Sequence, residues 1–262
     1  MSESAPAMLQ LQVSNRVASV VLSRAPANAI NPKWVDNFHL LLDELDTRDD
    51  WNVLHIRSAL QIFSAGADIK EMRHAFETGE GVGSLVAAVR DYQGLFARIE
   101  ALPQITLAEI GGAAMGGGFE LALSCDLRIV ADEARVGLPE IRLGLLAGAG
   151  GTQRLTRLCG RAVALRIIAG AEMVDGRTAV QLGMAQWHAP ADRLREVAMD
   201  LARHYADQPA LAGRLAKECI NAALDPTSTR GFDLEYEGSK TLLQSAESQA
   251  LITRFLASKA AK

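Results

Sequence analysis

The sequence has few of the residues that nucleic-acid binding requires. Aromatic side chains make up only 5% of the 262 residues, which is too few for the stacking surfaces that hold single strands. The net charge is −4 and no basic run occurs, whereas a duplex-binding face needs clustered Lys and Arg to neutralise phosphates. These absences argue against nucleic acid as a partner.

Cysteine is also scarce. Cys125, Cys159 and Cys219 form no CxxC pair, so we expect no disulfide framework and no metal cluster, and a reducing compartment fits. The five histidines are scattered, and we predict no metal site. No apolar run is long enough to cross a bilayer, and the start MSESAPAM lacks the features of a secretion signal. We therefore expect a cytoplasmic protein with no membrane segment.

Several common catalytic motifs are missing as well. The sequence has no GxxxxGK[ST] phosphate loop, no GxSxG nucleophile elbow and no HExxH zinc motif. The segment from Gly148 to Gly151 comes closest to a dinucleotide fingerprint, but it lacks the third glycine at its proper place. Nucleotide hydrolysis, serine hydrolysis and zinc proteolysis are therefore not indicated.

Up to Gly151 the sequence alternates between strand and helix patterns, which favours stacked βαβ-type units over a sandwich. Asn31 and Pro32 form a typical helix opening, with Asn as the cap and Pro in the first turn. The glycine-rich run 78–83 is predicted as a loop, and everything after Gly151 as helical. The expected strands are 9–13, 17–22, 53–56, 105–110 and 126–130.

Two glycine-rich segments, each close to a glutamate, are the best candidates for chemistry. They are AAMGGGFE (Ala113–Glu120) and LPEIRLGLLAGAGGTQRL (Leu138–Leu155). Glycines at a helix start allow a ligand to approach the unpaired N–H groups there, which suit an anion or an oxygen that becomes one. Close helix packing would explain the same glycines. Glu120 has apolar neighbours, so we expect partial burial and a raised pKa.

The stretch SAGADIKEM (Ser64–Met72) leaves three readings open. Asp68 could be a catalytic acid, Lys70 could be a Schiff-base amine, or the chemistry could lie in the backbone around Ala67. The residues alone do not decide among them.

FSAGADIKEM, GGxAxGGGFE and LPEIxLGLxxGAGGTQRL occur in this order, and together they resemble the crotonase, or enoyl-CoA hydratase/isomerase, superfamily. The resemblance extends over nearly the whole chain. It implies an α/β fold, a crotonase-type spiral of ββα units, with a C-terminal all-helical trimerisation region. We place the spiral core and acyl-CoA site in residues 1–200 and the helical region in 201–262, as one folded unit. The resemblance also implies a homotrimer or a hexamer made of two trimers.

The same resemblance implies a site for an acyl-CoA thioester, with no tightly bound cofactor and no metal. The N–H groups of Ala67 and Gly117 would hold the thioester oxygen, and Glu120 and Glu140 would be the acid–base pair. The backbone of Gly148 would position the water. Asp68 then becomes mainly a helix-start residue. The implied coenzyme A contacts are Arg24, Ala27, Asn28, Ala65, Ala67, Asp68, Ile69, Lys70, Gly117 and Lys259, the last reaching a neighbouring subunit.

The implied activity is that of an enoyl-CoA hydratase, as in fatty acid β-oxidation, which adds water syn to a trans-2-enoyl-CoA to give a 3-hydroxyacyl-CoA. Related enoyl-CoA isomerases and specialised hydratases or lyases keep the same thioester site and remain alternatives. Some hydratase homologues are linked to RNA through a basic early helix. Residues 31–51 contain one Lys and one Arg against six acidic residues, which disfavours that role. A catalytically silent assembly protein would not require both glutamates.

Overall fold

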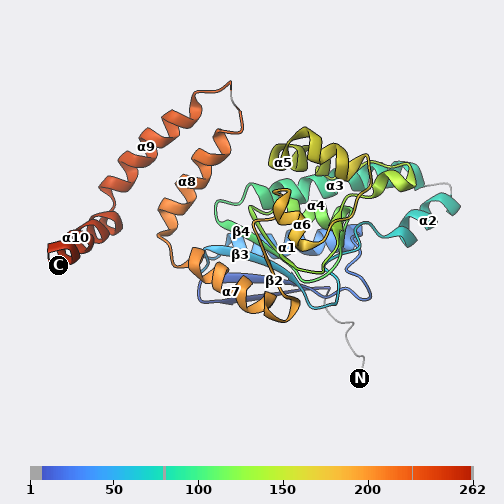
Figure 1. The fold of residues 1–262 in the computed structure, drawn as a ribbon, viewed down its shortest axis with the longest axis horizontal. Coiled ribbons are helices and arrows are strands. Elements are labelled where there is room, and N and C mark those ends of the chain that lie inside the picture. The colour runs from blue at the N-terminus through green and yellow to red at the C-terminus, as the bar shows by residue number, and fades with distance from the viewer. Residues whose placement is uncertain (1–7, 79–80, 226, 261–262) are drawn as a thin grey trace.

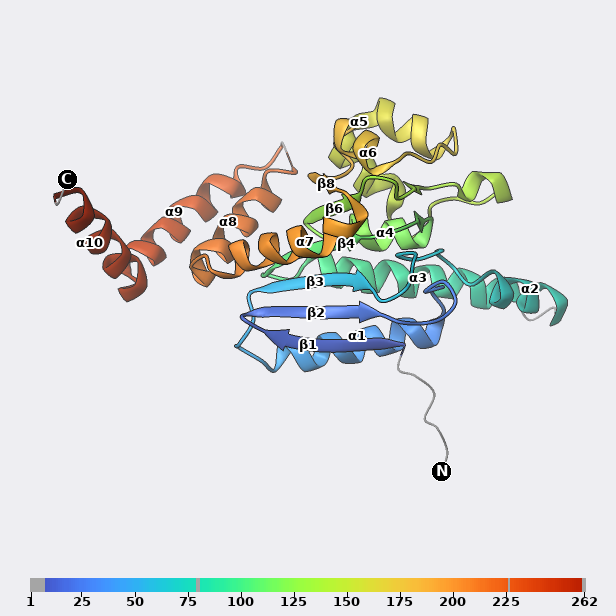
Figure 2. The same ribbon diagram turned by 60° about the horizontal axis from the view of Figure 1, so that its bottom comes forward.

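The computed structural model describes residues 8–78, 81–225 and 227–260. Its framework is a six-stranded sheet in the order β1-β2-β3-β4-β6-β8 (Figure 2). The first two strands are antiparallel and the remaining neighbours are parallel. The strands are β1 (Leu9–Ser14), β2 (Val17–Leu22), β3 (Val53–Ser58), β4 (Ile105–Ile110), β6 (Leu127–Ala131) and β8 (Trp187–Ala189).

Several strands of the main sheet are each followed along the chain by a very short strand segment, and these segments form a second layer. Single bridges join Ile30 to Ala67 and Ser64 to Ala114, and β5 (Ala114–Met115) pairs with β7 (Val136–Gly137). Helices complete each turn, so the chain winds as a spiral of ββα units and the predicted fold class is confirmed. The helices of this part are α1 (Pro32–Asp46), α2 (Ile69–Thr78), α3 (Gly81–Glu100), α4 (Gly117–Leu123), the 3-10 helix η1 (Glu140–Leu143), α5 (Gly151–Ile168) and α6 (Gly176–Gln181).

The predicted start of α1 is confirmed. The Asn31 side chain accepts a hydrogen bond from the backbone N–H of Trp34 at 2.9 Å, which satisfies one of the free donors of the first turn. The apolar face of α1, which includes Phe38 and Leu42, is fully buried. This burial fixes the helix against the core that supports the second layer.

The C-terminal helices divide into one that covers the sheet and three that project from it (Figure 1). α7 (Ala191–Ala206) buries Leu194, Ala198 and Ala202 against β-strands of the main sheet. Residue 200, where the sequence analysis divided the core from the helical region, lies within this helix. The projecting arm consists of α8 (Ala210–Ala222), α9 (Arg230–Gln244) and α10 (Ala246–Ala260).

Two local predictions are wrong. The region after Gly151 is not entirely helical, because β8 extends the main sheet beside β6, and its three residues are too few for a strand pattern to be visible. The predicted loop 78–83 is helical at Thr78 and from Gly81 onward, and residues 79–80 lie outside the described residues. Gly81 serves packing, because a methyl group there would lie 1.8 Å from the Ala75 carbonyl oxygen.

Within the described residues, no helix is both long enough and apolar enough to cross a membrane.

Candidate active site

Two backbone amides face one small space where the second-layer segments end. A methyl group at position 117 would lie 3.6 Å from the Ala67 nitrogen, so the two amide groups are close neighbours. In the described part of the chain, neither the Ala67 N–H nor the Gly117 N–H donates to another group. Gly117 is the first residue of α4, where N–H groups have no partner within the helix. The pair can therefore donate two hydrogen bonds to one oxygen.

Gly66 keeps this space open. Its φ of +84° is a conformation that favours glycine, and a side chain there would lie 3.0 Å from the Gly117 nitrogen and 2.7 Å from the Met115 carbonyl oxygen. The hydrogen bond from the Ile30 N–H to the Gly66 carbonyl, 2.8 Å long, holds the segment in place. Any side chain at position 66 would cover one of the two free amides.

Glu120 lies in the first turn of α4 and is only 3% exposed. Its Oε1 accepts a hydrogen bond from the N–H of Gly151, the first residue of α5, at 2.7 Å. Burial raises the pKa of Glu120 to about 7, although hydrogen bonds from the Gly151 and Ala149 amides lower it, and the neighbouring Glu140 carboxyl raises it further. The predicted burial of Glu120 is confirmed, and near neutral pH its carboxyl can either give or take a proton.

Glu140, the first residue of η1, brings a second carboxyl to the same place. A methyl group at Gly116 would lie 2.9 Å from its Oε1, so the carboxyl sits against the glycine that precedes the free Gly117 amide. Burial raises the pKa of Glu140 as well. Its Oε2 is buried and has no hydrogen-bond partner among the described residues. A buried, unpartnered carboxyl oxygen beside a second carboxyl is unusual, and such groups gather at functional sites.

Gly148 lies on the segment that joins η1 to α5, and α3 packs directly against it. The Gln93 side-chain N–H donates to the Gly148 carbonyl oxygen at 2.6 Å. A methyl group at Gly148 would lie 3.4 Å from Cγ1 of Val89. Gln93 was not predicted from the sequence, since a glutamine on a helix gives no signal of such a contact.

The family model described as Enoyl-CoA hydratase/isomerase matches residues 12–262 of this chain. The chain belongs to the enoyl-CoA hydratase/isomerase family. A protein named "Probable enoyl-CoA hydratase" from Mycobacterium tuberculosis is 36% identical over 218 residues, which are 83% of this chain and 82% of that protein. A protein of the same name from Bacillus subtilis is 38% identical over 201 residues, 76% of each chain. The solved structure of an enoyl-CoA hydratase from Bacillus anthracis has a TM-score of 0.89 and 29% identity, and the match covers 96% of this chain and 97% of that one.

In this family member, the segments proposed to contact coenzyme A lie side by side. The Ala65 N–H donates to the Ala27 carbonyl at 3.0 Å, and the Asp68 N–H donates to the Ile30 carbonyl at 2.9 Å. Asp68 directly precedes α2, and its Oδ1 accepts from the Lys70 N–H at 3.1 Å, as expected for a helix-start residue. The Lys70 and Ile69 side chains are exposed beside it.

Arg24 and Asn28 have structural partners. One Arg24 nitrogen lies 2.7 Å from an Asp68 carboxyl oxygen, and another donates to the Ala29 carbonyl at 2.7 Å. Asn28 is fully buried, and its side-chain amide donates to the Phe63 carbonyl at 2.9 Å. Both side chains therefore shape the loop, and the backbone N–H groups of the two residues also donate within it, Arg24 to the Asn28 Oδ1 and Asn28 to the Arg24 carbonyl.

Lys259 is not brought to this site within one chain. It lies near the end of α10, and α10 and α2 lie at opposite ends of the molecule (Figure 1). Its amino group is 4.7 Å from the centre of the Phe255 ring in the same helix. A contact with coenzyme A would need a second copy of the chain.

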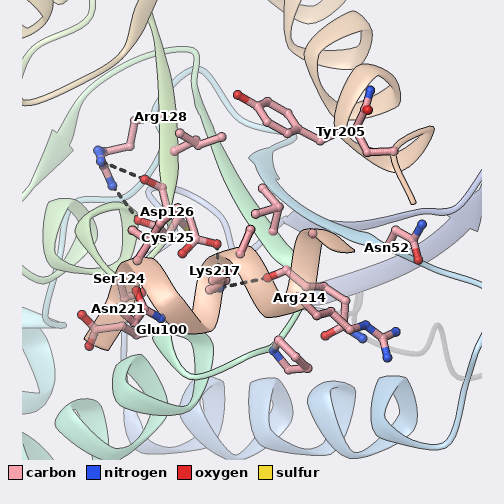
Figure 3. A pocket seen from close by; sticks show the side chains of 18 of the residues that line it. Asn52, Glu100, Ser124, Cys125, Asp126, Arg128, Tyr205, Arg214, Lys217 and Asn221 are labelled. Carbon is pink, nitrogen blue, oxygen red and sulfur yellow. Dashed lines mark hydrogen bonds and ion pairs between the residues drawn. The ribbon is translucent and has the colours of Figure 1, made fainter. Parts of the chain in front are cut away.

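A separate cavity of about 580 Å³ lies where the arm joins the body (Figure 3). Lys217 of α8 crosses this junction, and its amino group lies 2.7 Å from the Asp126 carboxyl and 2.9 Å from the Gln104 carbonyl oxygen. The residues that line the cavity, all within the described chain, include none of the predicted catalytic residues. No group of three or more His, Cys, Asp or Glu side chains in the described chain could hold a metal ion.

The raised pKa of Glu120 predicts an effect on stability. The carboxyl keeps its proton to about pH 7 in the folded protein, against an ordinary value of 4.5. The protonated carboxyl therefore makes its full contribution to the free energy of unfolding below about pH 4.5. This contribution is lost as the pH rises through about 7, and the free energy of unfolding falls by roughly 3 kcal/mol. The free energy of unfolding of Glu120→Gln minus that of wild type should therefore be larger at pH 8 than at pH 4 by this amount, as measured by urea unfolding. The exposed Glu133→Gln is the control, and an equal difference at both pH values would contradict the expectation.

Proposed function

We propose that this family member is an enoyl-CoA hydratase, which adds water syn to a trans-2-enoyl-CoA to give a 3-hydroxyacyl-CoA. The observation that carries the proposal is the meeting of two unpartnered amides, at Ala67 and Gly117, with the buried carboxyl of Glu120 and the half-buried carboxyl of Glu140. The amides suit the thioester oxygen, and the carboxyls suit the two proton transfers that hydration needs.

The thioester oxygen accepts hydrogen bonds from the Ala67 and Gly117 N–H groups. When the water oxygen bonds to C3, electron density moves through the conjugated system and the thioester becomes an enolate. The two donors stabilise this charge, and each is worth roughly 3–4 kcal/mol in comparable oxyanion holes. The donors are held by the backbone, so they need little reorganisation during the reaction.

The two glutamates carry the protons. We assign Glu140 as the main acid–base residue and Glu120 as its partner, with the Gly148 backbone helping to place the water. One carboxylate takes a proton from the attacking water, and a carboxylic acid gives a proton to C2, so that water is added across the double bond. Burial raises the pKa of both groups, and the Glu140 charge raises the pKa of Glu120 further, which supports one ionised and one protonated carboxyl near neutral pH.

An isomerase that shifts the double bond is the second candidate. It needs the same oxyanion donors but only one group to move a proton between two carbons. The presence of a second buried carboxyl at Glu120 favours hydration. Hydration is also redox-neutral, so the proposed reaction requires no bound cofactor.

Coenzyme A is proposed to lie along the backbone of residues 65–70 and the loop at Ala27 and Asn28, with Lys70 and Arg24 near its phosphates. Lys259 would come from a neighbouring copy in a homotrimer or hexamer, in a cytoplasmic enzyme. The arm supports such an assembly, because α9 and α10 expose many large apolar side chains. They are Phe232, Tyr236, Leu243, Leu251, Ile252, Phe255 and Leu256.

The proposal predicts turnover of crotonyl-CoA. The enoyl thioester absorbance should fall as the double bond is hydrated, and 3-hydroxybutyryl-CoA should accumulate. Longer straight-chain enoyl-CoA substrates should be assayed in parallel, because the acyl preference is part of the question. A shift of the double bond without water addition would favour the isomerase, and no turnover of any straight-chain enoyl-CoA would remove the hydratase proposal.

A further inference from the structure

A surface helix contacts the segment that carries the water-positioning glycine. The Gln93 amide donates to the Gly148 carbonyl at 2.6 Å, and Val89 packs against the same residue. These two side chains are four residues apart, so they lie on one face of α3. On its outer side, the Gln93 Oε1 accepts a hydrogen bond from Arg90 at 2.9 Å, which points the amide nitrogen toward Gly148.

Gly148 begins a four-residue segment that ends at Gly151, the first residue of α5. The Gly151 N–H donates to the Glu120 Oε1 at 2.7 Å. The segment thus links Gln93 on one side to Glu120 on the other. The hydrogen bond from Gln93 limits the movement of this segment and so holds the Gly151 N–H against the carboxyl.

We propose that Gln93 is a positioning residue for Glu120, which acts through the segment from Gly148 to Gly151 and ties α3 to the acid–base pair. The positioning role of Gln93 rests on the proposed hydratase function, but the hydrogen bond from the Gly151 N–H to the Glu120 carboxyl does not depend on which reaction the site catalyses. Gln93 touches neither substrate nor reacting atoms in this arrangement. Its effect is on the orientation and proton affinity of the carboxyl that does.

The first test measures Glu120 directly. Gln93→Met keeps the length of the side chain and removes the donor, and Asp91→Asn on the exposed side of α3 is the matched control. The carboxyl titration is followed by ¹³C NMR of glutamate labelled at the carboxyl carbon, with the signal assigned by Glu120→Gln. Loss of the Gln93 hydrogen bond loosens the Gly151 donor to the carboxylate, so the titration of Glu120 should move to higher pH. Asp91→Asn should leave it unchanged.

The second test measures turnover. Gln93→Met should lower kcat for enoyl-CoA about tenfold and leave KM within about twofold, as expected for loss of one hydrogen bond that matters in the transition state. Gln93→Lys restores a donor of similar reach and should recover most of kcat. A lower melting temperature with unchanged kcat and unchanged Glu120 titration would mean that Gln93 only docks α3, and the proposal would be wrong.

The two proposals can fail separately. If wild type hydrates no enoyl-CoA but Gln93→Met still shifts the Glu120 titration, the hydratase function falls and the positioning role stands. If wild type is an active hydratase and Gln93→Met changes neither kcat nor the titration, the positioning role falls alone.

Discussion

Glu140→Gln should lower kcat for enoyl-CoA hydration by about 10³-fold or more, since general acid–base groups typically contribute 10²–10⁴-fold. Glutamine has nearly the same shape as glutamate, but it can neither take the proton from water nor return one to C2. The cost to folding should be small, because the Glu140 Oε2 makes no hydrogen bond to the described residues that the substitution would break. Affinity for the acyl-CoA product, measured by calorimetry, should be largely retained.

Glu120→Gln is the companion variant and should show a loss of similar size. Its amide oxygen can still accept from the Gly151 N–H, so the start of α5 keeps its partner. Glu133→Gln provides the control, since Glu133 is an exposed glutamate outside the site. Near-normal kcat in either Glu120→Gln or Glu140→Gln would contradict the assignment of the pair.

Gly117→Ala should lower kcat/KM by about 10²–10³-fold, the usual cost of losing one oxyanion donor. The added methyl group would lie 3.6 Å from the Ala67 nitrogen, in the space where the thioester oxygen must accept both hydrogen bonds. Its other close neighbours, Gly66 Cα and Ile30 Cδ1, are at 3.6 Å and 3.7 Å, which are ordinary contacts. The protein should therefore fold, and in steady-state kinetics the loss should fall mainly on kcat.

The matched control is Gly94→Ala, because Gly94 lies on α3 and a methyl group there meets nothing within 4 Å. Its activity should equal that of wild type. By contrast, Gly118→Ala would place a methyl group 2.5 Å from the Ser64 carbonyl and should destabilise the fold. If Gly117→Ala retained full activity with normal stability, the thioester oxygen could not lie between the two amides.

The sequence predicted best where one local rule decides the structure. Asn31 begins a helix because its side chain caps it, and Glu120 is buried because its immediate neighbours are apolar. The pairing of Ala67 with Gly117 is different. Their separation of fifty residues follows no local pattern, and only the family resemblance brought them together.

The rest depended on contacts between distant segments. β8 is a strand because β6 is beside it, and Gly81 is a glycine because Ala75 passes so close. Arg24 was predicted to contact coenzyme A, but much of its hydrogen-bonding capacity goes to Asp68 and Ala29. Gln93 is a half-buried residue of α3 with no local sign of its partner. None of these relations has a signature in the residues next to it, because each depends on how the spiral closes.

The projecting arm would make the stability of the proposed oligomer depend on the protein concentration. No described side chain of α10 is buried, and α9 buries only Gly238, so these helices gain little free energy from their own chain. Helices of about fifteen residues are marginal in water without tertiary packing. In the proposed homotrimer or hexamer, a neighbouring copy would cover their apolar side chains and supply most of their stability, and by mass action that contribution would rise with the protein concentration. Dilution of the proposed oligomer would loosen the arm first, while the spiral core with Glu120 and Glu140 would remain folded.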